Sequence, residues 1–443
     1  MNVSTPTILI IVGITGDLSR RKLLPAISKL AAAGVLPQQF RIVGITRKKN
    51  VMLDSLLEGV TGSEHIRENI ELFSMSLTDS ADYERLSTHL NDISTELGGA
   101  PQRLWYLSVP PETAWPIIEQ LGASGLAKVP HTKLLLEKPF GTDEKSAHEL
   151  VAHIERSFAP EQVYRVDHYL AKETVQNIIA FRRDNSFFEH AWNQSAIERI
   201  DILASETIGI EGRATFYEQT GALRDLIQSH LLQLAALTLM ALPENDDRQN
   251  IPKARHALLQ TLHVDPNHIH LGQYEKYREE VTNLTSEVET FASLTFFSTD
   301  PRWKDVPITL TTGKALAEKK TEVIVTYRRN NASAANRLTI KIQPDEGIEL
   351  CFFAKRPGYE HVLERVPLAF TYAEHFTTLP DAYEHIFLGA LHGDHTLFVS
   401  NDEVHESWRI VDAARKEWGL HARALISYPR GSTVEEVLAK SAP

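Results

Sequence analysis

The sequence predicts an α/β domain with a doubly wound parallel sheet, followed by a larger α+β domain built on an antiparallel sheet plus helices. In the first 166 residues, short apolar runs alternate with helical patterns, which indicates parallel strands joined by helices. After residue 290, apolar strands follow one another without helical patterns between them, which indicates antiparallel pairing. A length of 443 residues with 42% apolar composition supports two cores, which we divide as 1–170 and 171–443.

The strands expected in the first domain are short runs rich in β-branched and other apolar residues. They lie at 7–14, 41–46, 70–75, 103–109 and 133–139, with a helical pattern at 18–33 after the first. In the second domain, helical patterns cover 172–183 and 221–240, and strands are expected at 291–297, 306–312, 322–329, 337–344 and 348–355. Because no linker rich in Pro or Gly separates the halves, we expect a continuous, tightly packed boundary near residue 170.

Composition restricts the partners and the compartment. The formal net charge of −12 disfavours nucleic acid, because phosphate contacts need clustered cations. The single cysteine, Cys351, excludes an intramolecular disulfide framework and suits a reducing compartment. The N-terminus has no basic leader with a cleavage site, and no apolar run is long enough to span a bilayer. We expect a cytoplasmic protein without a membrane partner.

A glycine turn follows the first expected strand, in "ILIIVGITGDLSRRKLLPAI". Gly13 and Gly16 stand where the strand turns into a helix, so backbone amides can approach a pyrophosphate at a helix N-terminus. The spacing departs from the common G-x-G-x-x-G of Rossmann-type domains, and a glycine turn without a ligand is the alternative. The strand, turn and helix context favours dinucleotide binding.

The end of the second strand indicates which dinucleotide is preferred. In NAD-selective domains an acidic residue there binds the ribose 2′-hydroxyl, whereas a 2′-phosphate calls for arginine. Here "RIVGIT" runs into Arg47, Lys48 and Lys49, without an acid. The alternative is a solvated basic loop, but the position favours NADP.

Ionisable side chains gather in "EKPFG" and "YRVDHYLAKE". Pro139 holds Lys138 in extended backbone at the end of a strand, where it could bond hydroxyls of cofactor and substrate; a surface lysine capping strand carbonyls is the alternative. His168 and Lys172 are four residues apart and would share a face of a helix. With Tyr169 they form a donor cluster suited to a phosphate monoester. Ionised Asp167 only accepts hydrogen bonds and needs another partner.

That partner is expected to be His230, on the apolar helix "GALRDLIQSHLLQLAALTLM". A lone histidine there could instead be a satisfied core residue. Asp225 lies five residues earlier, about 140° around an α-helix, so Asp167 is the better orienter and Asp225 is free to bind a substrate hydroxyl. His230 would remove a hydroxyl proton while NADP accepts a hydride. No spacing of metal ligands such as H-E-x-x-H occurs, so we expect no metal.

These motifs resemble the glucose-6-phosphate dehydrogenase family. The match runs in order through "GITGDLSRRKLLPA", "EKPFG", "YRVDHYLAKE", "GALRDLIQSHLLQL", "TGKAL", "IQPDEGI", "LPDAYE" and "DEVHESW", nearly the whole chain. The resemblance implies oxidation of β-D-glucose 6-phosphate at C1 to 6-phosphogluconolactone by NADP, the entry step of the pentose phosphate pathway. It also implies a homo-oligomer, a dimer or tetramer.

The resemblance implies a role for each matching residue. His230 is the base and Asp167 its partner. The residues implied to bind substrate are Lys138, His168, Tyr169, Lys172, Glu206, Asp225, Lys314, Lys319 and Gln343. The residues implied to bind the cofactor are Gly13, Thr15, Gly16, Asp17, Leu18, Lys22, Arg47, Tyr106 and Lys138.

The chain departs from the family pattern at four positions. Ala171 stands where the family commonly has Gly, and Ser229 where it has Asn; both residues are small, so we expect altered packing without lost chemistry. Thr311 and Ser400 replace arginines that in some members bind a second, structural NADP. We expect that second site to be absent.

Two other functions compete with this one. The first is a related oxidoreductase with the "EKP" lysine that acts on a non-phosphorylated sugar, which the cluster His168, Tyr169 and Lys172 argues against. The second is an NADP sensor without catalysis, which the presence of both His230 and Asp167 argues against.

Overall fold

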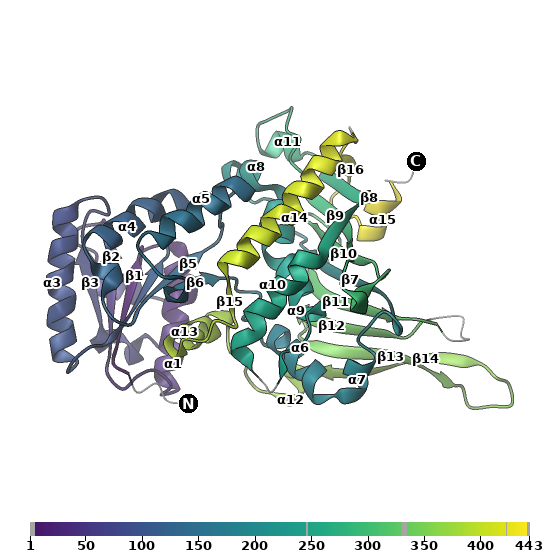
Figure 1. Cartoon of the computed structure of the whole chain (residues 1–443), viewed down its shortest axis with the longest axis horizontal. Coiled ribbons are helices and arrows are strands. Elements are labelled where there is room, and N and C mark those ends of the chain that lie inside the picture. Colours follow the sequence, from purple (N-terminus) through teal and green to yellow (C-terminus); the bar gives the residue numbers. More distant parts are fainter. Residues whose placement is uncertain (1–4, 245–246, 330–334, 422, 441–443) are drawn as a thin grey trace.

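The structure is a computed structural model, and it describes residues 5–244, 247–329, 335–421 and 423–440. It contains two sheets that lie side by side, with a long helix running across the second (Figure 1). The first sheet has the order β15-β6-β5-β4-β1-β2-β3 and the second the order β14-β13-β12-β11-β7-β10-β9-β8-β16. The predicted fold class is confirmed.

In the first sheet, all pairs are parallel except β15 with β6. Its strands are β1 (Thr7–Val12), β2 (Phe40–Thr46), β3 (Ile70–Ser74), β4 (Gln102–Leu107), β5 (Thr132–Glu137), β6 (Val163–Val166) and β15 (Phe398–Val399). Its helices are the π-helix η1 (Ser19–Leu23), α1 (Leu24–Ala32), α2 (Leu53–Leu57), α3 (Ser80–Glu96), α4 (Pro111–Ala123) and α5 (Glu144–Glu155). Every residue of β1 and β4 is buried, as expected for central strands covered on both faces.

The second sheet is mostly antiparallel, but β10 pairs with β7, and β16 with β8, in parallel. Its strands are β7 (Ile197–Ser205), β8 (Leu262–Tyr274), β9 (Phe291–Ser298), β10 (Ile308–Gly313), β11 (Lys320–Tyr327), β12 (Arg337–Gln343), β13 (Gly347–Lys355), β14 (Leu363–Thr371) and β16 (Ile426–Tyr428). Strands β7, β8, β14 and β16 were not predicted. In β8 the pattern includes exposed and half-buried residues, because one end of the strand lies at the surface.

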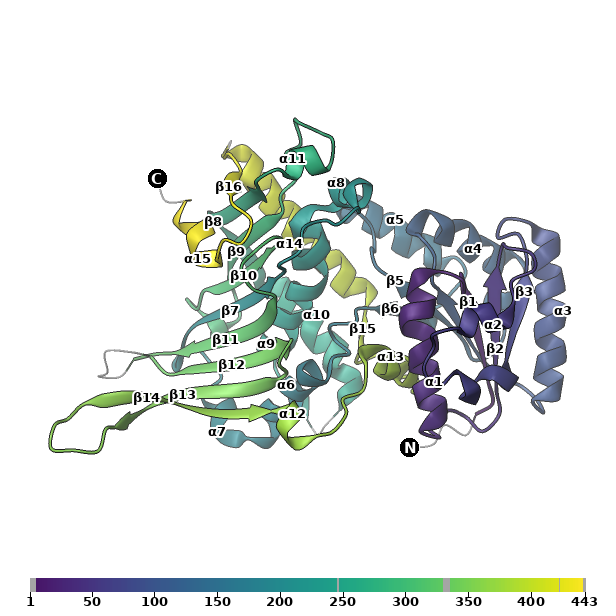
Figure 2. The same cartoon turned by 180° about the vertical axis from the view of Figure 1, so that it is seen from behind.

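Helices α6 (Glu173–Asp184), α9 (Leu232–Leu239), α10 (Ile251–Thr261) and α14 (Asn401–Leu420), with the π-helix η6 (Leu223–Leu231), cover one face of the second sheet. The other helices that follow residue 171 are α7 (Ser186–His190), α8 (Ala214–Ala222), α11 (Tyr277–Glu280), α12 (Tyr372–His375), α13 (Ala382–His392) and α15 (Val434–Ala439). From behind, strands β11 to β14 lie in front of α6, α9 and α10, and the β13–β14 hairpin projects from the body (Figure 2). No described helix packs on that side of these four strands.

The two halves share their packing. One hydrophobic cluster extends from strand β1 through α9 to α14, so the core is continuous across residue 170, as predicted. Late in the chain, α13 packs against α1, and β15 pairs with β6 at the edge of the first sheet. The first sheet is therefore completed by a segment that follows the second sheet in sequence. None of the described helices has the length and apolar character needed to cross a membrane.

Candidate active site

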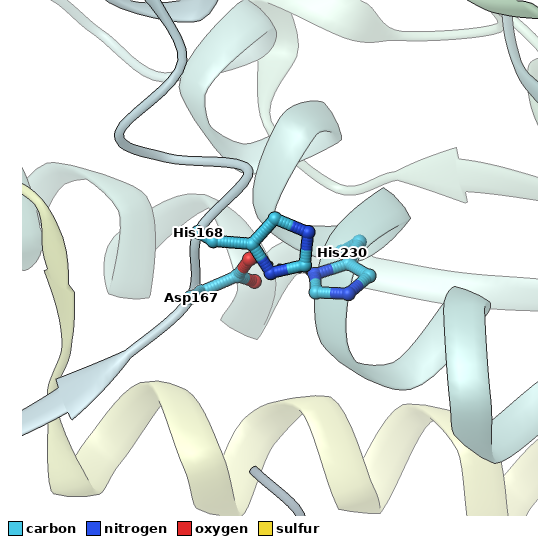
Figure 3. Close-up of side chains that lie close together, drawn as sticks. All are labelled: Asp167, His168 and His230. Carbon is cyan, nitrogen blue, oxygen red and sulfur yellow. Dashed lines mark hydrogen bonds and ion pairs between the residues drawn. The ribbon is translucent and has the colours of Figure 1, made fainter. Parts of the chain in front are cut away.

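The predicted base and its partner meet at the junction of the two sheets. Asp167 directly follows β6, and His230 projects from η6 toward it, with His168 beside them (Figure 3). The Nδ1 atom of His230 lies 2.6 Å from Oδ1 of Asp167, and both side chains are buried. The backbone N–H of Tyr169 donates to the same Oδ1 at 3.0 Å. Asp167 therefore fixes the imidazole so that Nε2 is left to accept a proton.

The helix that carries His230 is a π-helix and not the predicted α-helix. Its i→i+5 hydrogen bonding brings residues five apart to neighbouring positions, so Asp225 is not on another face. Indeed the charge of Asp225 acts on His230. The angular argument against Asp225 was wrong, but the pairing of His230 with Asp167 stands because only Asp167 is hydrogen-bonded to the ring.

Burial and charge set the protonation of this pair. Burial alone would raise the pKa of Asp167, but His230, His168 and the hydrogen bonds outweigh it and lower that pKa to about 2. Burial lowers the pKa of His230, although Asp167 opposes the shift. Near neutral pH the pair is an ionised carboxylate and a neutral imidazole, which is the state a general base requires.

The segment 167–172 contains no helix, because α6 begins at Glu173. The helical spacing proposed for His168 and Lys172 was therefore wrong, yet turns bring both to Tyr169. The His168 ring lies 5.1 Å from that of Tyr169, and the Lys172 ammonium lies 5.5 Å from the Tyr169 ring centroid. The Tyr169 ring in turn stacks on His230 at 4.1 Å.

His168 has a strongly shifted protonation equilibrium in the expected phosphate cluster. Burial and the neighbouring charges of His230, Lys138 and Lys172 lower its pKa to about 3. It is neutral near pH 7 and offers a ring N–H as a donor, while Lys172 supplies the positive charge. A bound phosphate dianion would oppose the shift, because opposite charge favours the protonated ring.

The residues expected around a sugar form paired contacts. Lys138 lies 3.2 Å from Asp225, and Lys314 pairs with Glu206. Lys172 donates to Gln343 at 2.9 Å, and the charge of exposed Lys319 acts on Lys172. The peptide bond between Lys138 and Pro139 is cis. The structure thus brings the predicted substrate residues into one region that includes His230.

The glycine turn forms a cavity at the carboxyl ends of β1 and β2. Gly13 has φ +85°, and a Cβ there would lie 2.4 Å from the carbonyl oxygen of Ser108. Only glycine allows this approach. Predicted residues in the lining are Gly13, Thr15, Gly16 and Arg47, joined by Lys48, Ser108, Pro110 and Thr113. Such a cradle fits a dinucleotide.

Four predicted cofactor residues have other contacts. Asp17 is exposed and faces Arg21, and Leu18 is half-buried. Lys22 pairs with Asp381 at 2.8 Å. Tyr106 is fully buried, does not line the cavity, and donates its hydroxyl to Glu137 at 2.5 Å.

Three polar residues beside the site were not predicted to act there. Glu137 accepts hydrogen bonds from the hydroxyls of Tyr106 and Tyr383. Tyr383 belongs to the motif "LPDAYE", and its hydroxyl lies 3.3 Å from the Glu137 carboxylate. Burial raises the pKa of Glu137. Thr321 accepts from Gln343 at 3.0 Å. The register that sets Thr321 opposite Gln343 in β11 and β12 could have revealed Thr321. Tyr383 lies in the motif "LPDAYE", but the motif does not show that its hydroxyl reaches Glu137.

Two further features belong near this site. The possible metal-ligand atoms of Asp167, His168 and His230 lie within 4.8 Å of one another, a spacing that a metal ion could use. However, the hydrogen bond between Asp167 and His230 already occupies one atom of each of these two residues.

An apolar pocket between α4 and α5 is lined by Leu107, Trp115 and Phe140, among others. It contains none of the residues predicted to bind substrate or cofactor.

A dinucleotide cradle at the carboxyl ends of parallel strands, together with a buried histidine–aspartate pair, defines an NAD(P)-dependent oxidoreductase. Residues 10–177 match the NAD binding domain of glucose-6-phosphate dehydrogenase, and residues 179–441 match its C-terminal domain. The chain is 34% identical to glucose-6-phosphate 1-dehydrogenase of Chlamydia muridarum, over 96% of this chain and 93% of that one.

Comparison with solved structures points to the same family as the sequence comparisons. A glucose-6-phosphate dehydrogenase in complex with its substrate glucose-6-phosphate has a TM-score of 0.91 and 30% identity, covering 99% of this chain and 98% of that one. Glucose-6-phosphate 1-dehydrogenase from Mycobacterium avium has a TM-score of 0.84 and 28% identity, covering 99% and 97%. The chain belongs to the glucose-6-phosphate dehydrogenase family.

Proposed function

We propose that this chain oxidises β-D-glucose 6-phosphate at C1 with NADP and yields 6-phosphogluconolactone. The observation that carries the proposal is the buried pair of His230 and Asp167, 2.6 Å apart, with the charge of Lys138 acting on it, in a chain that also has a dinucleotide cradle. Family membership agrees, because a relative of high structural similarity has glucose 6-phosphate as its substrate.

The proton moves through His230. Its Nε2 accepts the proton of the C1 hydroxyl, and Asp167 stabilises the imidazolium that forms. Asp225 and Lys138 lie beside the pair and would hold sugar hydroxyls through the carboxylate and the ammonium. The nicotinamide ring, when bound, supplies the acceptor for the C1 hydride.

NADP is the dinucleotide that we assign to the cradle. Arg47 and Lys48 line it after β2, and neither is paired with an acid by a described salt bridge. A guanidinium at this position can bind a 2′-phosphate through charge-assisted hydrogen bonds. The Thr311 hydroxyl bonds that of Ser293 between β10 and β9, and Ser400 caps α14, so neither offers the cation of a second site. Calorimetric titration should find one NADP per chain.

The phosphate of the substrate is assigned to His168, Tyr169 and Lys172. Lys172 would supply the charge and the two rings their N–H and O–H donors. Binding energy used at this remote group would raise kcat/KM for the phosphorylated sugar alone.

The test follows NADPH absorbance with glucose 6-phosphate and then with glucose. Wild type should turn over the first far better. Lys172→Ala should lose at least about tenfold in kcat/KM for glucose 6-phosphate and little for glucose. The exposed Lys253→Ala is the matched control. Equal rates of wild type with both sugars would reject the substrate assignment.

We also propose how the parts are divided. Residues 1–170 bind the dinucleotide, and residues 171–443 bind the sugar and contact a second copy; the ends, 1–4 and 441–443, lie outside the described residues. We assign the enzyme to the cytoplasm, in line with a lone cysteine.

A further inference from the structure

Two buried oxygen atoms near the catalytic pair have no hydrogen-bond partner. One is Oδ2 of Asp167, and the other is Oε1 of Gln233, on α9 one turn after His230. Both side chains are almost fully buried, with exposed fractions of 3% and 2%. A buried ionised carboxylate whose second oxygen receives no donor is strongly disfavoured.

Both residues line the same small cavity behind Asp167, away from the ring of His230. Its other polar walls are Lys138, Gln228, Ser229 and Ser407. The space holds about one water molecule, which needs two to four polar partners. Two side chains have N–H groups left to donate to a water. The Gln228 amide donates one of its two N–H groups to Ser407 Oγ, and the Lys138 ammonium donates only to the carbonyl and carboxylate oxygens of Asp225. The remaining walls are the apolar side chains of Phe140, Val166, Val399 and Val404, so the polar groups named here are the partners available to a water.

We propose that one water molecule occupies this cavity, donating to Asp167 Oδ2 and to Gln233 Oε1, and that Gln233 is thereby a positioning residue for the His230–Asp167 pair. The proposal deepens the proposed function, on which its kinetic readout rests. A water bonded in this way satisfies both oxygens at once, whereas an apolar side chain would satisfy neither.

The bridge has a definite electrostatic effect. A donor on Oδ2 stabilises the unprotonated pair, which carries a negative charge, more than the protonated pair, which is neutral. With this donor in place, His230 therefore stays unprotonated down to a lower pH than it would without it. The charged or titratable groups that also face the pair are His168, Lys138, Asp225, Glu137, Tyr169 and Tyr383, and the variants below leave all six in place.

The test compares Gln233→Met with Thr238→Val. Methionine has nearly the volume of glutamine but no acceptor. Thr238 is also on α9 and also carries a buried oxygen without a partner, yet it does not line the cavity. For Gln233→Met, the acid limb of the kcat/KM profile should move up by about one pH unit, with about tenfold lower kcat/KM at acid pH and little change in KM. For Thr238→Val, the profile should match wild type.

An unmoved acid limb in folded Gln233→Met, or an equal shift in Thr238→Val, would overturn the proposal. A crystal structure of the wild-type enzyme is the second measurement, because it needs neither a folded variant nor activity. Density for a water within roughly 3.2 Å of Asp167 Oδ2 and Gln233 Oε1 is expected. An empty cavity would overturn the water bridge even if the enzyme oxidises glucose 6-phosphate. Conversely, the water could be seen in an enzyme that failed to oxidise that sugar.

Discussion

Single residues at the site follow closely from their sequence motifs. Asp167 and His230 were paired from the sequence because ionised Asp167 only accepts hydrogen bonds and does not suit a phosphate-binding cluster, and because His230 is the only histidine in its apolar helical stretch. The structure confirms the contact at 2.6 Å. The protonation state of His168 could not be predicted in the same way, because it depends on burial and on charges from three separate segments.

His230→Asn should lower kcat by about a hundredfold or more while KM changes little, since the amide fills the site but cannot accept the proton. Steady-state rates with glucose 6-phosphate and NADP measure this. The exposed His392→Asn serves as the control and should resemble wild type. A His230→Asn enzyme with a tenth of the normal kcat would show that another group is the base.

His168 should make the folded state sensitive to acid. Its folded pKa is about 3 and its ordinary value is 6.5, so between these pH values the unfolded chain binds a proton that the folded chain does not. The free energy of unfolding should therefore fall as pH drops from 7 to 5, and less so in His168→Asn. Urea unfolding at both pH values is the measurement, and identical losses in the two proteins would contradict it.

Secondary-structure elements were predicted best where they are buried and regular. The strands β9, β12 and β13 were placed within a few residues because their apolar residues cluster or alternate clearly. The π-helix η6 was missed because no residue pattern separates it from an α-helix. The turns at 167–172 were taken for helix because ionisable spacing alone cannot report backbone geometry.

At the end of β2, Arg47→Ala should raise KM for NADP by about tenfold or more and leave KM for NAD nearly unchanged, because the guanidinium would bind only the 2′-phosphate. Lys49→Ala is the matched control, since Lys49 is exposed in the same loop but does not line the cradle. Kinetics with both dinucleotides decide it. Equal effects on NADP and NAD would mean that the basic run is a solvated loop.

A buried ion pair holds α10, α14 and β15 together. Arg255 and Glu403 are both fully buried, and Arg255 also donates to the carbonyls of Thr396 and Phe398. Glu403→Gln leaves a buried guanidinium without its counter-charge and should cost about 3 to 5 kcal/mol of unfolding free energy. Glu406→Gln breaks the more exposed pair with Arg409 and should cost about 0 to 1 kcal/mol. Chemical denaturation compares them.

At the scale of the molecule, the side of strands β11 to β14 without a described helix is a candidate subunit contact. Directly paired residues share a face, so Ile324, Thr339, Glu349 and Ala369 form one row across this side. Adjacent Leu368 points to the opposite side of the sheet, where its side chain is 58% exposed. We expect particles of at least two chains.

Ala369→Arg should therefore reduce the mass of the particle toward that of one chain, because a long cation would separate two packed sheets. Leu368→Arg, on the same strand but the opposite side, should leave the mass unchanged. Light scattering at several protein concentrations measures both. If wild type is a monomer throughout, or both variants dissociate alike, the contact lies elsewhere.

The pairing of β15 with β6 bears on how the protein is made. During synthesis the first sheet emerges early, but the strand that completes its edge and the helix α13 that packs on α1 emerge more than two hundred residues later. Until then an unpaired strand edge and an apolar helix surface remain open on the growing polypeptide. A chain truncated before residue 382 would therefore keep these surfaces exposed and tend to aggregate, and only synthesis of the segment from α13 to β15 closes them.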